Sequence, residues 1–244
     1  MPDDFAALLD SPDGLVAGVL NSHPSTRSLL AAAVVRQLSN LAPEIIPFME
    51  KSGTFLTVLD KASYGHGDAG FPKGLLRFER LYYDLGTTIR PIDPVDPDTV
   101  RAYQERPSQA YPIRACWYEE RLQFGPAPAG AYTVKWDVTL DATKDATSGT
   151  TITVSDGAAT NPWFTTGKVA LRHLVWADYF MTSPDQRPEM ASAHGNSAQV
   201  ALERLREAGR KRQAMNAVVC TPNAFDNYRA SPSARLQTIF PGAR

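Results

Sequence analysis

The chain has 244 residues, of which 43% are hydrophobic and 21% charged, and its formal net charge is −1. This is an ordinary globular composition with room for one large or two small domains, and it excludes the global positive field typical of nucleic-acid-binding domains. The N-terminus is acidic, unlike a signal peptide, and no apolar run approaches the roughly 20 residues that span a bilayer. Two cysteines form no disulfide framework, so a reducing compartment and a buried structural role for Cys116 are expected.

The first quarter of the chain is predicted to be helical. Apolar residues 5–9 and 15–20 flank a turn-forming DSPDG and predict two short helices. A longer helix is expected from about Ser22, because proline is tolerated in a first turn and apolar residues then recur at helical spacing (Leu30, Val34, Leu38 and Leu41). After Pro43, residues 44–51 are predicted to add another helical turn or two, ending at Gly53.

The next stretch is predicted to alternate strands and loops. Residues 54–63, 75–83 and 87–95 read as strands, with a glycine-rich loop at 64–70. In 75–83 the apolar residues divide between both faces, so the register is not fixed by the pattern. Asp96 followed by Pro97 has the form of an N-cap and a helix-starting proline, which predicts a short helix over 98–106.

Residues 111–140 form the part of the sequence with the clearest strand pattern. They predict strands at 111–118, 121–124 and 131–140, with a turn at Glu119-Glu120 and a rigid linker at 125–128. In the third strand, Tyr132, Val134, Trp136, Val138 and Leu140 alternate with Thr133, Lys135, Asp137 and Thr139. One face should therefore be buried, and the other should meet solvent or a partner.

The last part is predicted to return to helices. Residues 141–149 read as a polar linker, 150–154 as a short strand and 155–162 as a loop. A helix starting near Thr165 would carry an apolar stripe of Ala170, Leu174, Ala177 and Met181, reinforced by Leu171, Val175 and Trp176. A last helix would run from about Arg187 or Ser197 to about Met215, with an apolar face of Ala198, Ala201, Leu202, Leu205 and Ala208.

The order of elements predicts an α+β fold, with a helical body, an inserted antiparallel β-sheet subdomain and an extended C-terminal tail. Residues 1–52 would form the N-terminal helices of the body, and 53–160 the β-rich insert with one short helix. Residues 161–215 would form the C-terminal helices of the body, and 216–244 an extended arm. The arm contains too few apolar residues for a core of its own, so we expect it to become ordered only on contact with a partner.

Motifs for catalysis or cofactor binding are not found in the sequence. GxSxG, HExxH, GxGxxG and CxxC are absent, and Thr166-Gly167-Lys168 is better explained as a helix start than as a phosphate-binding loop, because Pro162 replaces its first glycine. Asp93, Asp96 and Asp98 are separated by prolines, which favours turn and capping roles over a cation site. We therefore expect no catalytic residue, no cofactor and no bound metal.

The histidines and a run of basic residues leave more than one interpretation open. His66 and Asp68, in GHGDAG, would suit a general-base pair in a small hydrolase, although no nucleophile is marked nearby. His23, His173 and His194 are scattered and are expected in helix caps, the core or an interface. The run on the last helix is either a solvated face or a contact for a neighbouring subunit, an acidic partner or DNA phosphates (Arg204, Arg206, Arg210, Lys211 and Arg212).

Four stretches, in order, resemble segments of a known family. They are an early two-helix unit, a strand pair leading into a capped helix, the strand block, and a closing helix entered from a proline–aromatic loop (STRSLLAAAVVRQLSNLAPEIIPFM, RFERLYYDLGTTIRPIDPVDPDTVRAYQERPS, YPIRACWYEERLQFGPAPAGAYTVKWDVTL and NPWFTTGKVALRHLVWADYF). Over roughly residues 22–215 the chain resembles the head–tail adaptor (connector, head-completion) proteins of tailed bacteriophages. It departs from them at 1–20, 141–160 and 216–244.

The resemblance implies a structural virion protein without enzymatic activity, located at the head–tail junction and assembled in the host cytoplasm. Such proteins form homo-oligomeric rings, commonly dodecamers, beneath the portal protein. The ring extends the channel for packaged double-stranded DNA and provides the docking platform for a tail nozzle, stopper or tail terminator. No membrane is involved. The alternative is another tail-completion or minor tail structural protein.

In several members of that family the C-terminal segment reaches onto the portal. By this resemblance the portal-binding residues here would be the apolar and basic side chains near the C-terminus (Arg235, Leu236, Ile239, Phe240 and Arg244). Isolated apolar residues in a polar segment fit such a role, because a partner surface would bury them.

Overall fold

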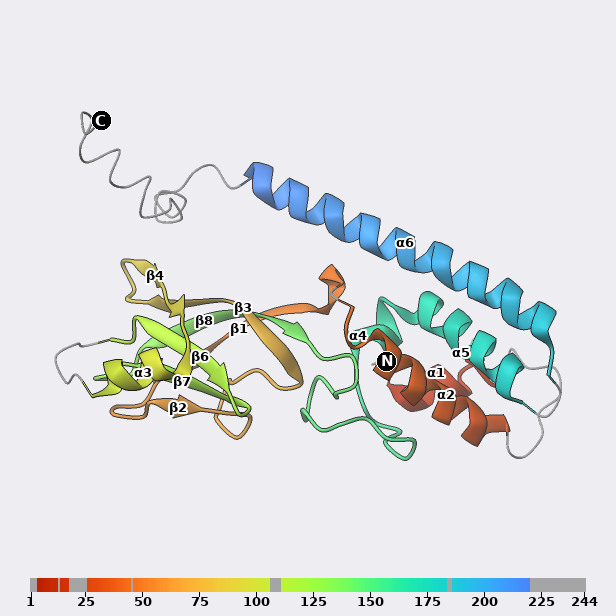
Figure 1. Cartoon of the computed structure of the whole chain (residues 1–244), viewed down its shortest axis with the longest axis horizontal. Coiled ribbons are helices and arrows are strands. Elements are labelled where there is room, and N and C mark those ends of the chain that lie inside the picture. Colours follow the sequence, from red (N-terminus) through yellow and green to blue (C-terminus); the bar gives the residue numbers. More distant parts are fainter. Residues whose placement is uncertain are drawn as a thin grey trace. The chain divides into compact units, whose positions relative to one another are not determined.

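The computed structural model of the protein describes residues 4–12, 14–17, 26–44, 46–105, 111–183 and 186–219, with side chains described up to Lys211. Within these ranges the fold is mixed α and β, as the sequence predicts (Figure 1). The chain divides into two compact units, Met1–Leu205 and Arg206–Arg244. The elements described below lie in the first unit, except that the last helix continues into the second.

The helices lie near the two ends of the sequence, with one between the strands. They are α1 (Phe5–Asp10), α2 (Thr26–Leu41), the 3-10 turn η1 (Pro47–Met49), α3 (Pro97–Gln104), α4 (Pro162–Thr165), α5 (Lys168–Thr182) and α6 (Pro188–Val219). The predicted stripe on α2 is confirmed, because Leu30, Val34, Leu38 and Leu41 are all buried. The start predicted at Ser22 lies outside the described residues. Of the second short helix predicted over 15–20, residues 15–17 form a turn instead of a helix, and the rest lie outside the described residues.

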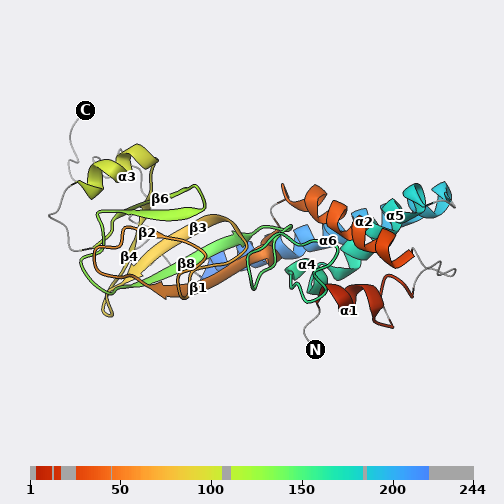
Figure 2. The same cartoon turned by 90° about the horizontal axis from the view of Figure 1, so that it is seen from below.

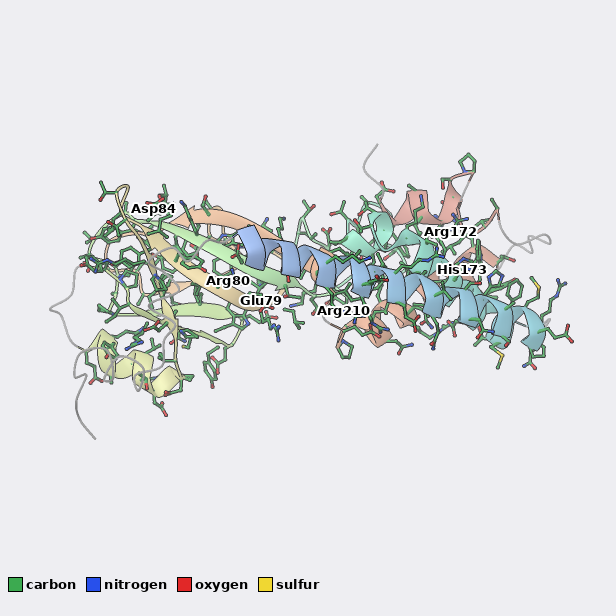
Figure 3. All side chains as sticks on the ribbon, turned by 90° about the horizontal axis from the view of Figure 1, so that it is seen from above. Glu79, Arg80, Asp84, Arg172, His173 and Arg210 are labelled. Carbon is green, nitrogen blue, oxygen red and sulfur yellow. The ribbon has the colours of Figure 1, made fainter. Side chains whose placement is uncertain are left out.

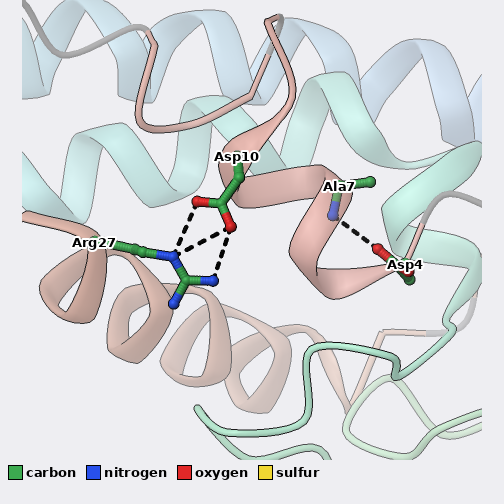
Figure 4. A network of polar contacts seen from close by, with 4 residues as sticks. All are labelled: Asp4, Ala7, Asp10 and Arg27. Carbon is green, nitrogen blue, oxygen red and sulfur yellow. Dashed lines mark hydrogen bonds and ion pairs between the residues drawn. The ribbon is translucent and has the colours of Figure 1, made fainter.

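Helix α1 is fixed at both ends by aspartates (Figure 4). The Asp4 carboxylate caps the helix by accepting a hydrogen bond from the Ala7 backbone N–H at 2.7 Å. At the other end, Arg27 of α2 donates to both oxygens of Asp10, at 3.0 and 2.8 Å. The two contacts satisfy a free backbone donor and join α1 to the start of α2.

The strands form two four-stranded sheets. The first has the order β1 (Glu50–Leu56), β8 (Thr133–Leu140), β3 (Leu75–Asp84) and β4 (Ile89–Pro91), with β1, β8 and β3 side by side (Figure 2). The second has the order β2 (Ser63–Tyr64), β7 (Arg121–Gly125), β6 (Arg114–Tyr118) and β5 (Asp93–Pro94). All neighbouring strands pair antiparallel except β5 and β6, which are parallel.

The block at 111–140 therefore supplies both sheets. β6 and β7 form a hairpin in the second sheet, and the predicted turn is confirmed, since Glu119 and Glu120 have φ angles of 50° and 57°. After the cis Gly125–Pro126 bond the chain passes to β8, the inner strand of the first sheet. The predicted alternation in β8 is confirmed: Val134, Trp136, Val138 and Leu140 are buried.

The polar face of β8 is only partly open to solvent, because cross-strand partners cover it. Asp137 accepts a hydrogen bond from Ser52 at 2.7 Å, and Lys135 forms an ion pair with Asp84 at 2.8 Å. Thr139 is buried and donates to Glu79 at 2.5 Å. This face is thus supplied with partners from β1 and β3 of the same chain.

Three predictions between residues 44 and 95 need correction, one of a helix and two of strands. The helical turns predicted over 44–51 are only the short η1, and β1 then runs through Gly53, where a Cβ would lie 2.3 Å from the Trp136 ring. The strand predicted at 54–63 is the end of β1, a loop and β2; the one at 87–95 is β4 and β5, in different sheets. In β3, two register shifts explain why its apolar residues divided between both faces.

The polar insert at 141–160 is a loop held in place by hydrogen bonds rather than a linker. The strand predicted at 150–154 is wrong. The only pairing described there is a single bridge between Lys144 and Thr151. The buried Asp145 carboxylate organises the loop by accepting from the backbone N–H and the hydroxyl of both Ser148 and Thr160, at 2.5 to 2.8 Å. These hydrogen bonds hold the pKa of Asp145 far below its usual value despite its burial.

The closing helices differ from prediction in which side of α5 is buried. The predicted stripe is wrong as a core face: Ala170 is buried, but Leu174 and Ala177 are half-buried and Met181 is exposed. The core takes the neighbouring face (Ala170, Leu171, Val175, Tyr179 and Phe180), which includes Leu171 and Val175, two of the three residues predicted to reinforce the stripe. Helix α5 carries apolar residues on both faces, so periodicity could not choose between them.

Helix α6 starts at the earlier of the two predicted positions and extends through Val219, beyond the predicted end. Ala198 and Leu202 of its predicted apolar face are buried, Ala201 and Leu205 are half-buried, and Ala208 is exposed. Residues 216–219, predicted to be extended, are helical, and the rest of the predicted arm lies outside the described residues.

Candidate functional site

The predicted basic run lies on the solvent side of α6. Arg204, Arg206, Arg210 and Lys211 are exposed, as Figure 3 shows for Arg210, whereas the side chain of Arg212 lies outside the described part of the chain. Lys211 forms an ion pair with Glu207 at 2.8 Å, one helical turn away, and this pair lowers the pKa of Glu207. Basic and acidic side chains therefore alternate along this face, which favours contact with a protein surface of mixed charge over a purely anionic partner.

The portal-binding residues predicted by the resemblance lie outside the described residues. They are Arg235, Leu236, Ile239, Phe240 and Arg244, all after Val219, where the described chain ends. Cys220 and His23 also lie outside it.

An apolar groove lies at the surface between three helices. It has a volume of about 610 Å³ and is lined from α2, α5 and the start of α6 (Gln37, Leu174, Ala177, Asp178, Met181, Pro188, Ala191 and Ser192). Leu174, Ala177 and Met181 follow one another along a single face of α5 at helical spacing, which is the stripe that the sequence marks as core. The structure leaves this stripe at the surface.

Local contacts fix the shape of the groove. The Arg36 guanidinium on α2 donates twice to one oxygen of Asp178 on α5, at 3.1 and 2.7 Å, and holds the two helices together at its edge. At the end of α5, the Ser183 N–H donates to Tyr179 O and the Arg187 N–H to Phe180 O. These bonds direct the chain into Pro188, the first residue of α6.

Beneath α6, the structure joins two histidines that the sequence leaves scattered. Nδ1 of His173 on α5, a residue labelled in Figure 3, lies 3.1 Å from Nδ1 of His194 on α6, so one ring donates a hydrogen bond to the other. The His194 ring also stacks on Phe180 at 5.6 Å, and the Arg172 guanidinium lies 4.9 Å above the Trp176 ring. Burial lowers the pKa of both histidines. The nearby His194 and Arg172 lower the pKa of His173 further.

The His66–Asp68 loop is not arranged as a general-base pair. His66 Nδ1 lies 3.2 Å from the carbonyl oxygen of Pro72, and its ring packs between Phe71 and Trp117. Asp68 forms an ion pair with Lys61 and accepts from the Gly65 N–H at 2.9 Å. The two side chains thus have other partners, although both line the same shallow pocket of about 420 Å³.

The other predicted sites have structural roles in the described chain. Asp96 caps α3 by accepting from the Thr99 N–H, as predicted, while Asp93 forms an ion pair with Arg114 and Asp98 with Arg101. Among the described residues no cluster of three or more histidines, cysteines or acids could hold a metal ion. Cys116 is buried as predicted, and burial raises the pKa of its thiol.

None of the helices in the described chain is long and apolar enough to cross a lipid bilayer. No family model and no curated protein sequence matches the chain.

The structure adds the arrangement of the surfaces of the chain. Two features of that arrangement, the groove and the histidine pair, were not predicted from the sequence. The groove could have been suspected from the apolar residues on both faces of α5, whereas nothing local in the sequence connects His173 with His194.

Proposed function

We propose that the chain is a structural protein of a tailed bacteriophage virion: a head–tail adaptor whose copies, about twelve of them, form a ring beneath the portal. The observation that carries the proposal is the order of elements in the four stretches that resemble this family. They fold as α2, as β3 to β5 leading into the capped α3, as β6 to β8, and as α4 and α5. These elements follow one another in the implied order, except that the first stretch, expected as a two-helix unit, has one helix and the 3-10 turn η1.

The surfaces of the described chain support a role in assembly. The groove leaves apolar side chains of α5 and α6 at the surface, beside the polar Gln37 of α2, and exposed apolar surface commonly marks a contact with another protein. The solvent side of α6 adds a face of mixed charge that suits specific docking. A ring subunit needs such surfaces toward its neighbours, the portal and the tail.

In the proposed assembly the C-terminal segment binds the portal protein through Leu236, Ile239 and Phe240, with Arg235 and Arg244 beside them. The ring lies at the head–tail junction, assembles in the host cytoplasm and surrounds the packaged double-stranded DNA. Its other side receives a tail nozzle, stopper or tail terminator. The chain acts through contacts alone and carries no enzymatic activity.

Portal binding by three matched variants tests the proposal. A truncation lacking residues 231–244 and the triple substitution Leu236→Asp/Ile239→Asp/Phe240→Asp should both lose binding to the purified portal complex by more than tenfold. The control Gln237→Asp/Thr238→Asp adds charge to the same segment without removing an apolar side chain and should bind as the unaltered chain does. Thermal unfolding of all three should match the unaltered chain, because the core of the described chain ends before residue 206. If the unaltered chain fails to bind the portal, the adaptor assignment is wrong and a minor tail protein takes its place.

A further inference from the structure

Helix α5 has more apolar surface than the chain covers. Leu171, Val175 and Phe180 are buried in the core, while Met181, which ends the second stripe, is 57% exposed. The stripe lines a groove whose other walls come from α2 and α6, so it has a defined shape and not merely an exposed side chain. A shaped apolar groove at the surface calls for an apolar side chain to fill it.

A second feature of the same chain presents apolar side chains outward. Leu56, Val58 and Leu59, here called the apolar turn, lie at and just after the end of β1 and are 62%, 55% and 60% exposed. Surface residues of this kind are common singly, but three within four positions make a protrusion. They are the most exposed run of aliphatic side chains in the described chain.

The apolar turn is rigid, because its backbone is bonded on both sides. The Val58 N–H donates to the buried Tyr64 hydroxyl at 2.7 Å, and the Asp60 N–H donates to Pro128 O at 2.8 Å. Lys61 N–H closes the turn onto Val58 O at 3.1 Å, with Asp60 in the left-handed region at φ 58°. Thr57, buried between the exposed residues, donates through its hydroxyl to Gly130 O. Such a preorganised protrusion loses little conformational entropy on docking.

The apolar turn and the groove match in charge as well as in polarity. Asp60, exposed beside Leu59, adds a negative charge, whereas the neighbouring Lys61 is already paired with Asp68. At the groove, Arg36 contacts the lining residue Asp178, and the exposed Arg187 immediately precedes the lining residue Pro188. Because Arg36 is itself paired with Asp178, the basic side chain that the acidic flank of the turn would meet at the edge of the groove is Arg187.

We propose that the apolar turn of one copy seats in the α2–α5–α6 groove of the next copy. The turn and the groove are both exposed in the chain described here, so the turn does not fill the groove of its own chain. Because they are different surfaces of one chain, the contact is heterologous and repeats from copy to copy, which closes into a ring when the rotation permits. The inference rests on the proposed function in that it supplies the contact that would build the adaptor ring.

Two single-surface variants test the contact, with self-association of the full chain measured by analytical ultracentrifugation. Val58→Asp/Leu59→Asp removes the apolar turn, and Met181→Glu places a charge in the groove. Each should weaken self-association at least tenfold. Val154→Asp and Val200→Glu make the same chemical changes at other exposed valines, 53% and 49% exposed, and should associate as the unaltered chain does. Circular dichroism and thermal unfolding confirm that each variant is folded.

Mixing the two variants gives the sharper result. The turn variant keeps its groove and the groove variant keeps its turn, so an equal mixture should form a dimer of one copy of each and nothing larger. A contact between identical surfaces would instead be lost in only one of the two variants, and the other variant would self-associate without the mixture. The proposal is overturned if the mixture stays monomeric, if both variants associate as the unaltered chain does, or if the unaltered chain is monomeric at its highest soluble concentration.

Portal binding of the same two variants separates this inference from the proposed function. Both retain residues 231–244, so each should still bind the portal complex, although more weakly because a ring no longer presents many tails at once. If the portal is bound but the variants still form rings, the adaptor assignment stands and this contact is wrong. If the contact is found but the unaltered chain does not bind a portal, the contact stands and the assignment is wrong.

Discussion

Strand β8 and helix α5 are both strongly apolar, but the chain completes the surroundings of only one of them. β8 buries Val134, Trp136 and Val138 on one face, and partners from β1 and β3 cover much of its polar face. α5 buries one apolar face and leaves Leu174, Ala177 and Met181 along an open groove. The sheet is completed within the chain, whereas the helical part has an apolar surface that the described chain leaves uncovered.

The difference shows what an apolar pattern in a sequence means. Periodicity identifies the side chains that leave water, but it does not say whether the protein that covers them is the same chain or another. For β8 the covering residues belong to this chain. For the second stripe of α5 we infer that they belong to the next copy.

The largest expected effect is in the completed sheet. Trp136→Ala should lower the free energy of unfolding by about 3–5 kcal/mol, because it empties the space over Gly53 at the centre of the sheet. The control Lys135→Ala, on the opposite face of the same strand, removes a partly exposed ion pair and should cost about 1 kcal/mol or less. Urea unfolding followed by fluorescence of the other tryptophans measures both. Equal losses would contradict the described burial of this strand.

The next effect is expected in the loop between β8 and α4. Asp145→Ala should lower the free energy of unfolding by about 3 kcal/mol, because it leaves the donors of Ser148 and Thr160 without their shared acceptor. Asp141→Ala, which removes a carboxylate that accepts only from Thr143 among its described hydrogen bonds, should cost about 1 kcal/mol.

Asp145 also predicts a dependence on acid. Its folded pKa lies below the unfolded value of about 3.9, so its stabilisation is present above that pH and is lost as the pH falls toward the folded value. The Asp145→Ala variant should therefore lose less stability between pH 5 and pH 2 than the unaltered chain does. A parallel decline in both chains would show that the carboxylate is not held as described.

A smaller, pH-dependent effect is expected where α5 meets α6. The folded pKa values of His173 and His194 are lowered, so the unfolded chain binds more protons than the folded chain just below the unfolded pKa of about 6.5. The stabilisation is complete above pH 6.5 and decreases as the pH falls through the folded values. His173→Gln/His194→Gln should flatten this decline in thermal unfolding, and Asn196→Gln, on the same helix, should not. An unchanged slope in the double variant would contradict the pairing.

The smallest effect on stability is expected in the groove. Met181→Ala should change the free energy of unfolding by less than about 0.5 kcal/mol, because the side chain is mostly exposed in the single chain. Phe180→Ala, its buried neighbour, should cost about 3–5 kcal/mol. A large loss for Met181→Ala would show that the stripe belongs to the core of its own chain and would remove the contrast with β8.

The sequence predicts those features whose signals are local. The α2 stripe, the cap at Asp96, the turn at Glu119-Glu120 and the alternation in β8 each depend on residues within one or two turns of one another. Where a feature depends on residues far apart in the sequence, the prediction was wrong or was not made. β1 is set by Trp136, more than eighty residues away, and the role of Asp145 depends on Thr160.

The same limit applies to the candidate surfaces. The exposure of the basic run on α6 could be predicted, because its charges are close together in the sequence. The groove could only be suspected from the two apolar faces of α5, because its shape needs α2, α5 and α6 placed together. The histidine pair likewise exists only through the packing of α5 against α6.

The most direct test of the account is a cryo-electron microscopy map of virions that contain this chain. We predict a ring of copies directly beneath the portal, with the C-terminal segment of each copy on the portal surface and the turn at Val58 and Leu59 in the groove of its neighbour. A map that places the chain elsewhere in the particle, or in single copies without a ring, would contradict the account.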